Sequence, residues 1–470
     1  MESTTPVLVT LVVYNAMLIG VGLWARGRNK GVEDFFLAGR GLGPWVAAIS
    51  ASASSSSAWT LLGVSGAAYA WGLPALWLFP ATVGGFLINW VWIAPRLQTL
   101  ARQENAITLS AIIAPPDIGK MRQTILRVAA GIIVFCFVFY IASQFEAAGK
   151  AFESVFGLSK QTSILIGAGI VLAYTLLGGF WAVSVTDSVQ GVLMVVAAIV
   201  LPMAALLAVG GFSAMFAGLA EIGSAGSPLG DDALAGVSGV LFVLGLFGIS
   251  IGYPGQPHVV NRYMALKDRQ SLRQGRIIAI VWALIVYSGM LLLGLSCRVL
   301  FTDLGDSEQV LFKAASDLLP PVIAGVMLAA VLSAIMSTAD SQLLVASSAI
   351  SYDWNLASRT GNAGLANTRI TVVAVLFLAT VLAMVWRADI FSRVLFAFSA
   401  AGSAFGPILI TRLMGRSVRA SATFGAMLVG FTMTVVIAWT PDTPGDVAER
   451  LVPFICAFII AFQGSQKVSK

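Results

Sequence analysis

The polar residues of one apolar segment, 332–348, carry the strongest chemical signal in this sequence. Its letters are LSAIMSTADSQLLVASS, so one carboxylate, Asp340, and several hydroxyls interrupt an apolar run. A carboxylate inside a membrane costs roughly 2.5 to 3.5 kcal/mol on insertion scales, so it marks a candidate functional site. Helical spacing puts Ser337, Asp340 and Ser341 on one face at i, i+3 and i+4.

A second polar stretch, 49–66, reads ISASASSSSAWTLLGVSG, and its first half places six serines, between Ser50 and Ser57, in an apolar span. Serine hydroxyls compete for backbone hydrogen bonds, and broken backbone at membrane depth is tolerated only where it is buried in protein or lines a cavity. The freed carbonyls and hydroxyls are neutral, hard oxygen ligands, which a small alkali cation accepts in place of part of its hydration shell. We interpret this stretch as half of a sodium site. The alternative is tight helix packing through small residues.

A third stretch, 245–258, reads GLFGISIGYPGQPH, and its glycines and prolines make a continuous helix improbable. Interrupted helices are the best sequence indication of a midplane binding site in a transporter. The alternative is a helix end followed by a cytoplasmic turn, because Arg262 comes soon afterwards. His258, the only histidine, is expected at the inner boundary, and with no ligand partner nearby it predicts neither a metal site nor a catalytic dyad.

Composition indicates a polytopic all-α membrane protein. Hydrophobic residues make up 58% of the chain, charged residues 11%, and the mean hydropathy is +0.89. The net charge of +6 does not indicate a nucleic-acid partner, because the basic residues lie in short loops between apolar spans. The three cysteines have no CxxC spacing, so neither a disulfide framework nor a metal site follows.

Thirteen apolar runs are long enough to cross a bilayer. The distribution of basic residues predicts that the N-terminus is outside and the C-terminus inside. We expect one membrane domain and treat the first run as a retained helix. The runs lie near 6–25, 44–72, 74–95, 126–149, 161–179, 186–209, 236–256, 274–297, 320–350, 370–386, 390–411, 420–440 and 450–464.

Five motifs together support a family resemblance. They are GRGLGPWVAAISASASSSSAWTLLG, AYTLLGGFWAVSVTDSVQG, GYPGQPHVVNRYMA, IMSTADSQLLVASSAI and AFSAAGSAFGP. With their order and spacing, the chain resembles the sodium:solute symporter family, and most closely its bacterial sodium/proline branch. The resemblance implies a leucine-transporter-like fold of two inverted five-helix repeats, 44–209 and 236–411, in the bacterial cytoplasmic membrane. Segment 6–25 is then a leading helix, 420–464 is peripheral, and the first and sixth core helices are broken at the serine run and at 245–258.

The resemblance also implies site residues. The shared sodium site would take carbonyls from Ala53, Ser56 and Ala334 and hydroxyls from Ser337 and Thr338. The solute would lie beside Tyr140, Tyr253 and Pro257. Two positions of this solute region depart from the branch: Ser55 replaces an aspartate, and Ile249 replaces a tryptophan one turn before Tyr253.

Some relatives, including sialic acid transporters, bind an additional sodium. The matching positions here are Asp187, Ser337, Asp340 and Ser341. Two nearby carboxylates repel unless a cation lies between them or one takes up a proton. We therefore hypothesise that the coupling charge has moved from the first core helix, at Ser55, to Asp187 and Asp340, and that a second sodium binds there. The alternative is that Asp187 caps its helix and Asp340 hydrogen-bonds neighbouring backbone.

The expected function is sodium-coupled import of a small solute by alternating access, with proline or a related amino acid as the first candidate. Sodium, the solute and the bilayer are the expected partners, with no obligate protein partner and no enzymatic activity. The alternatives are proton coupling, a carboxylate, vitamin or sugar as solute, or a membrane sensor without transport. Glu146, inside the fourth span, is expected to pair with Lys150 at i+4 rather than to carry protons.

Overall fold

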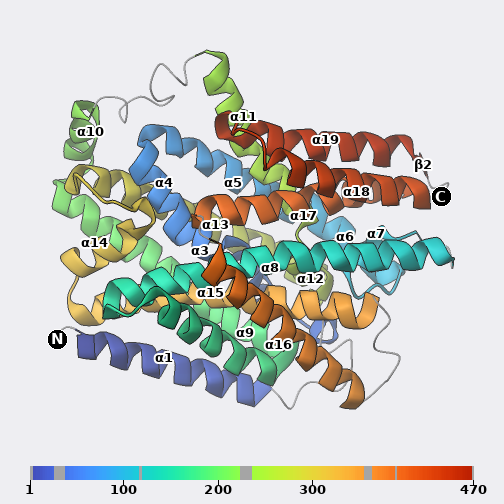
Figure 1. The fold of residues 1–470 in the computed structure, drawn as a ribbon, viewed down its shortest axis with the longest axis horizontal. Coiled ribbons are helices and arrows are strands. Elements are labelled where there is room, and N and C mark those ends of the chain that lie inside the picture. The colour runs from blue at the N-terminus through green and yellow to red at the C-terminus, as the bar shows by residue number, and fades with distance from the viewer. Residues whose placement is uncertain are drawn as a thin grey trace.

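The computed structural model describes residues 4–25, 37–115, 119–222, 236–353, 362–386 and 389–467. These residues are almost entirely helical, and their longer helices run along the long axis of the molecule (Figure 1). The first half contains α1 (Thr4–Ala25), α3 (Pro44–Ala58), α4 (Val64–Trp71), α5 (Leu78–Leu87), α6 (Ala94–Gln103), α7 (Leu109–Ile113), α8 (Lys120–Phe156), α9 (Lys160–Val209) and α10 (Phe212–Glu221). The second half contains α11 (Val237–Gly252), α12 (Pro257–Ala265), α13 (Arg269–Leu300), α14 (Val310–Leu318), α15 (Pro321–Ser348), α16 (Asn362–Val385), α17 (Ile390–Leu413), α18 (Ala420–Ile437) and α19 (Val447–Gln463). Two short strands, β1 (Arg416–Val418) and β2 (Ser465–Lys467), pair antiparallel beside α18.

The outer helices present apolar side chains where a soluble protein would present polar ones. Val13 of α1 and Phe377 of α16 are 63% and 64% exposed. Within the described residues, eight helical stretches are long and apolar enough to cross a membrane by themselves. The chain is therefore a membrane protein, while thirteen crossings, the N-out orientation and the two-repeat division stay predictions.

The serine run breaks its helix at Ser57. That residue has φ 54° and ψ −175°, a conformation that a non-glycine residue adopts only when its surroundings hold it there. Gln144 of α8 stabilises this conformation, because its Oε1 accepts a hydrogen bond from the backbone N–H of Ala58 at 3.0 Å. A π-helical turn, Trp59–Gly63, then leads into α4. The predicted break in 49–66 is confirmed.

Close packing also occurs along this helix, as the alternative interpretation expected. A Cβ added to Gly191 of α9 would lie 2.4 Å from the Ile49 side chain of α3. The break and the tight packing therefore coexist, because small residues serve both.

The second predicted break, in 245–258, is also present. One 3-10 turn, Tyr253–Gly255, separates α11 from α12, and Gln256 between them is extended (φ −94°, ψ 100°). All nine residues of α12 are buried, including Arg262. The interpretation of this stretch as a cytoplasmic turn, with Arg262 as a loop cation, is wrong because the chain continues as a helix, α12, whose residues are all buried in the core.

The fifth and sixth predicted spans meet at a single residue. Gly179, with φ 59° and ψ −168°, bends α9 into two helical arms. Asp187 lies about two turns into the second arm and is fully buried. The expectation that Asp187 caps a helix is wrong, because only the first turn of a helix has free N–H groups to cap.

Candidate functional site

The broken helix α3 and helix α15 are hydrogen-bonded to each other at the predicted sodium site. Thr338 Oγ1 donates to the Ser54 carbonyl at 3.0 Å, and Ser54 Oγ donates to the Ser337 carbonyl at 2.9 Å. Both bonds lie in the turn before the break at Ser57, where carbonyl groups lose their helical partners. The contact brings together the five predicted ligands, all of which are fully buried: Ala53, Ser56, Ala334, Ser337 and Thr338.

The oxygens offered there are neutral. Ser337 Oγ lies 3.3 Å from the Ala334 carbonyl, so two of the predicted ligands on α15 are adjacent. The Ser56 carbonyl accepts from Thr60 Oγ1 at 2.6 Å, which leaves it a second lone pair. Carbonyl and hydroxyl oxygens suit a hard cation of low charge.

Tyrosine hydroxyls surround the same break on the solute side. Tyr140 of α8 donates to Ser57 Oγ at 3.2 Å. The hydroxyls of Tyr253, in the 3-10 turn before α12, and Tyr287 in α13 are 3.3 Å apart, and Thr60 Oγ1 lies 3.3 Å from the Tyr287 hydroxyl. The structure therefore joins the two predicted tyrosines to both helix breaks.

Tyr287 was missed from the sequence. It lies in the apolar run LIVYSGMLLL, whose composition does not distinguish it from a structural residue. Its position in the middle of a predicted span could have identified it. Tyrosine is enriched at membrane interfaces, and a hydroxyl in the middle of a span needs a hydrogen-bond partner.

The remaining predicted solute residues are buried near these tyrosines. Pro257 opens α12, and Ile249 is buried one turn before Tyr253 on α11. Ser55 Oγ donates to the Ser52 carbonyl at 3.0 Å, so its hydroxyl is used within its own helix. His258 is fully buried and packs edgewise against Tyr140, with ring centroids 6.1 Å apart, and its place at the inner boundary stays a prediction.

A buried ion pair occupies the region proposed for a second cation. Arg262 Nη2 lies 2.8 Å from Asp187 Oδ2, and both side chains have no exposed surface. Ser50 of α3 donates to the same carboxylate oxygen at 2.7 Å and accepts from Arg262 Nε at 3.0 Å. Broken helix α12 is thus tied to α9 and α3 by one guanidinium.

The same guanidinium reaches Asp340 through one hydroxyl. Arg262 Nη2 lies 2.5 Å from Ser341 Oγ, which donates to Asp340 Oδ1 at 3.1 Å. From the sequence alone, only sodium or a proton was expected to offset the repulsion between Asp187 and Asp340. This expectation is corrected, because the Arg262 guanidinium contacts Asp187 directly and Asp340 through Ser341. Arg262 was missed as a site residue because a charge so soon after a helix break was counted as a loop charge.

Glu146 has a different partner from the one expected. Its Oε1 pairs with Lys160 at the start of α9, with side-chain exposures of 3% and 35%. Lys150 instead contacts Glu308 at 2.6 Å and Asp306 at 2.7 Å. Glu308 in turn accepts the backbone N–H of Phe391 at 2.9 Å, at the start of α17. The predicted Glu146–Lys150 pair is wrong, but the structural role expected of Glu146 stays a prediction.

We expect Glu146→Gln to keep most of the uptake activity with an unchanged pH profile. The substitution leaves Lys160, which is one-third exposed, to be solvated by water and lipid headgroups. Uptake measured across a pH series tests this, with Lys160→Gln as the matched variant. That variant strands the buried carboxylate and should impair uptake more. Loss of uptake in Glu146→Gln together with a shifted pH profile would instead identify a proton carrier.

Comparisons with known proteins show which proteins this chain is similar to. The model of the sodium:solute symporter family matches residues 35–430. The chain is 34% identical to the sodium/proline symporter of Salmonella typhimurium, over 97% of this chain and 92% of that protein. It is 33% identical to the high-affinity proline transporter PutP of Bacillus subtilis, over 94% and 93% of the two chains.

Solved structures establish the fold. A substrate-bound, outward-open sodium-coupled sialic acid symporter aligns with a TM-score of 0.80 at 17% identity, over 99% of both chains. MhsT in complex with L-phenylalanine aligns with a TM-score of 0.57 at 15% identity, over 88% of this chain and 97% of the other. The predicted all-α, leucine-transporter-like fold is confirmed.

Proposed function

This chain belongs to the sodium:solute symporter family, and we propose that it imports proline or a closely related amino acid on a sodium gradient. It is a multi-pass membrane transporter that couples a small solute to sodium, and not an enzyme. The curated relatives named above, all bacterial, support proline as the solute and the cytoplasmic membrane as the location.

The observation that carries the proposal is the pair of hydrogen bonds between α15 and the turn of α3 before Ser57. In our proposal sodium binds beside these bonds, taking the carbonyls of Ala53, Ser56 and Ala334 and the hydroxyls of Ser337 and Thr338, since a donating hydroxyl keeps lone pairs for a cation. A cation held jointly by the two helices fixes their relative position. That position is what changes when a transporter alternates between outward-open and inward-open states.

The solute would bind on the other side of the same break. Tyr140 and Tyr253 would offer hydroxyls, and Pro257 an apolar ring. Ile249 in place of a large aromatic ring leaves more space there, which suits a solute at least as large as proline. Because both sites share the Ser57 break, sodium binding stabilises the solute site, and by linkage the solute raises sodium affinity by the same factor.

The test is solute uptake into proteoliposomes made with the purified chain. Labelled proline should accumulate when sodium is outside and potassium inside, and accumulation should stop when the sodium gradient is removed. Other labelled amino acids, organic acids and sugars in the same assay define the solute class.

Three outcomes would contradict the proposal. Accumulation driven by a proton gradient without sodium would assign proton coupling. Uptake of a carboxylate, vitamin or sugar in preference to proline would change the solute. Sodium-dependent proline binding without accumulation would identify a sensor.

A further inference from the structure

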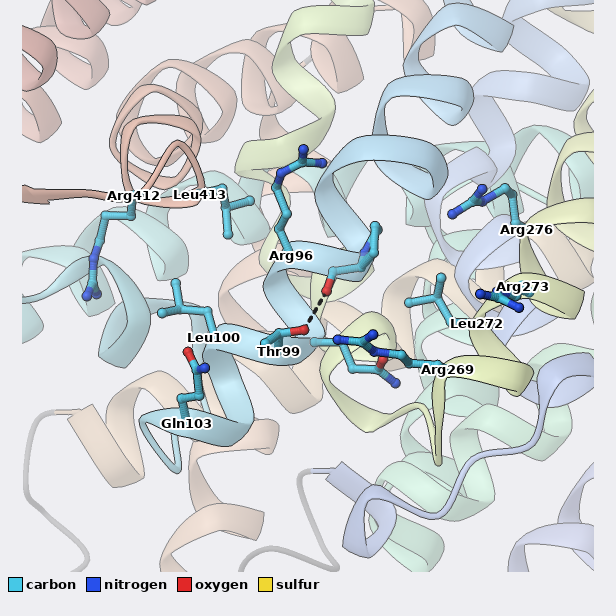
Figure 2. Close-up of a pocket in the computed structure, with 13 residues that line it drawn as sticks. Arg96, Thr99, Leu100, Gln103, Arg269, Leu272, Arg273, Arg276, Arg412 and Leu413 are labelled. Carbon is cyan, nitrogen blue, oxygen red and sulfur yellow. Dashed lines mark hydrogen bonds between the residues drawn. The ribbon is translucent and has the colours of Figure 1, made fainter. Parts of the chain in front are cut away.

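Five arginines line one hollow at the end of the molecule that carries β1 and β2 (Figure 2). The hollow measures about 710 Å³ and lies between α6, the first turns of α13 and the end of α17. In Figure 2, Arg96 stands near the middle, with Arg412 on one side and Arg273 and Arg276 on the other. The positive-inside pattern predicts that this end faces the cytoplasm.

Only one of these charges has a carboxylate counter-ion among the residues that the structure describes. Arg412 pairs with Glu104 at 2.6 Å. Across the part of the chain that the structure describes, no carboxylate lies within ion-pair distance of Arg96, Arg269, Arg273 or Arg276. Asp268 is close in sequence, but its carboxylate accepts the Ser271 backbone N–H at 2.7 Å, which also holds its pKa below the usual value. The hollow therefore keeps a strong positive potential.

The position of three arginines increases this potential. Arg269, Arg273 and Arg276 follow a spacing of i, i+4 and i+7 in the first turns of α13, so they share one face. The N-terminus of a helix is the positive end of its dipole, and cations are stabilising at the opposite end. Unpaired cations here repel both the helix and one another, and a bound anion would relieve that repulsion.

We propose that this hollow binds the phosphate group of an anionic phospholipid. Guanidinium groups match phosphate oxygens with paired hydrogen bonds, and basic pockets between helices on the cytoplasmic side are where anionic headgroups lie. Leu100, Leu272 and Leu413 line the same hollow and offer apolar contact to the glycerol backbone. Ile277, directly after Arg276 on α13, is 65% exposed, so an exposed apolar side chain stands next to the hollow.

The bound headgroup would brace the inner end of broken helix α12. Gln98 and Arg102 of α6 donate to the Leu266 carbonyl just after α12, at 3.1 and 2.8 Å. Arg276 Nε donates to the Trp90 carbonyl at 3.1 Å, which ties α13 to the turn before α6. A phosphate shared by α6 and α13 would tighten this clamp, so anionic lipid should raise the uptake rate. Only this consequence rests on the proposed function; lipid binding does not.

The binding test uses the double variant Arg269→Gln/Arg273→Gln of the full chain. Both side chains are exposed and donate no hydrogen bond within the described structure, so their loss should not affect folding. The matched control is Lys120→Gln/Arg127→Gln, which removes two exposed charges from the start of α8 on the same predicted side. Native mass spectrometry in detergent micelles counts phosphatidylglycerol or phosphatidylcholine retained during titration.

The wild type and the control should retain phosphatidylglycerol about 30-fold more tightly than the double variant, since each arginine near the surface contributes roughly fivefold. Phosphatidylcholine should not distinguish the three proteins, and inorganic phosphate at matched ionic strength should not compete.

Displacement by inorganic phosphate would assign the hollow to a soluble phosphate instead of a lipid. Equal phosphatidylglycerol retention in wild type and double variant, or an equal loss in the control, would overturn the site. Retention as expected with no proline uptake would leave this site intact and overturn only the proposed transport.

Discussion

Replacing Arg262 by glutamine should abolish sodium-dependent uptake and lower the thermal stability of the purified protein. The guanidinium is the charged partner of Asp187 in a fully buried pair, and removing one member strands the other charge at a typical cost of 3 to 5 kcal/mol, about half or more of the stability of many domains. The substitution also frees α12, which this one side chain ties to α3 and α9. Thermal unfolding and proteoliposome uptake measure the two effects separately.

The double variant Asp187→Asn/Arg262→Gln is the control for the charge effect. It removes both charges and should recover most of the lost stability, because neither is left unpaired. A single variant Arg262→Gln with wild-type stability and uptake would contradict the role assigned to this pair.

Sodium stoichiometry follows from the same pair. Because Arg262 already supplies a positive charge beside Asp187 and Asp340, we expect one sodium per solute and a Hill coefficient near one in the wild type. A coefficient near two that falls to one in Asp340→Asn would instead restore the second sodium at Asp187, Asp340 and Ser341.

Replacing Thr338 or Ser337 by alanine should raise the sodium concentration for half-maximal uptake by roughly tenfold, because the ion loses one oxygen ligand, a contact comparable in energy to a hydrogen bond to a charged group. Thr338 Oγ1 contacts the Ser54 carbonyl of α3, and Ser337 Oγ lies beside the Ala334 carbonyl, so both hydroxyls are in reach of a cation at the break. Initial uptake rates over a sodium series at fixed proline measure the shift.

Two variants on the same helix make this prediction specific. Thr338→Ser keeps a hydroxyl and should keep most of the sodium affinity. Ser347→Ala removes a buried hydroxyl that only donates within α15, to the Leu344 carbonyl at 2.9 Å, and should leave the sodium dependence unchanged. Unaltered sodium dependence in both alanine variants at 337 and 338 would remove these residues from the sodium site.

The sequence by itself determined the class of protein and both helix breaks. A run of apolar segments is sufficient to predict membrane helices, because the bilayer imposes length and apolarity on each segment independently. The breaks near Ser57 and Tyr253 could also be predicted from the sequence, because serine hydroxyls, glycines and prolines disturb the helical backbone within about one turn of their own positions. The order of five such motifs was enough to identify the family.

Only the tertiary structure decided the partners of the buried charges. Lys150 stands at i+4 from Glu146 on α8, yet it pairs with Glu308, which is 158 residues away, and Glu146 pairs with Lys160 of the next helix. Arg262 reads as a loop charge, yet it lies between Asp187 and Ser341, 75 and 79 residues away in the chain. Hydropathy and spacing describe one helix at a time, whereas the partner of a buried ion depends on which helices pack together and how each is rotated. A buried charge must find its counter-ion wherever packing places one, so these pairs follow from the assembled bundle and not from any local pattern.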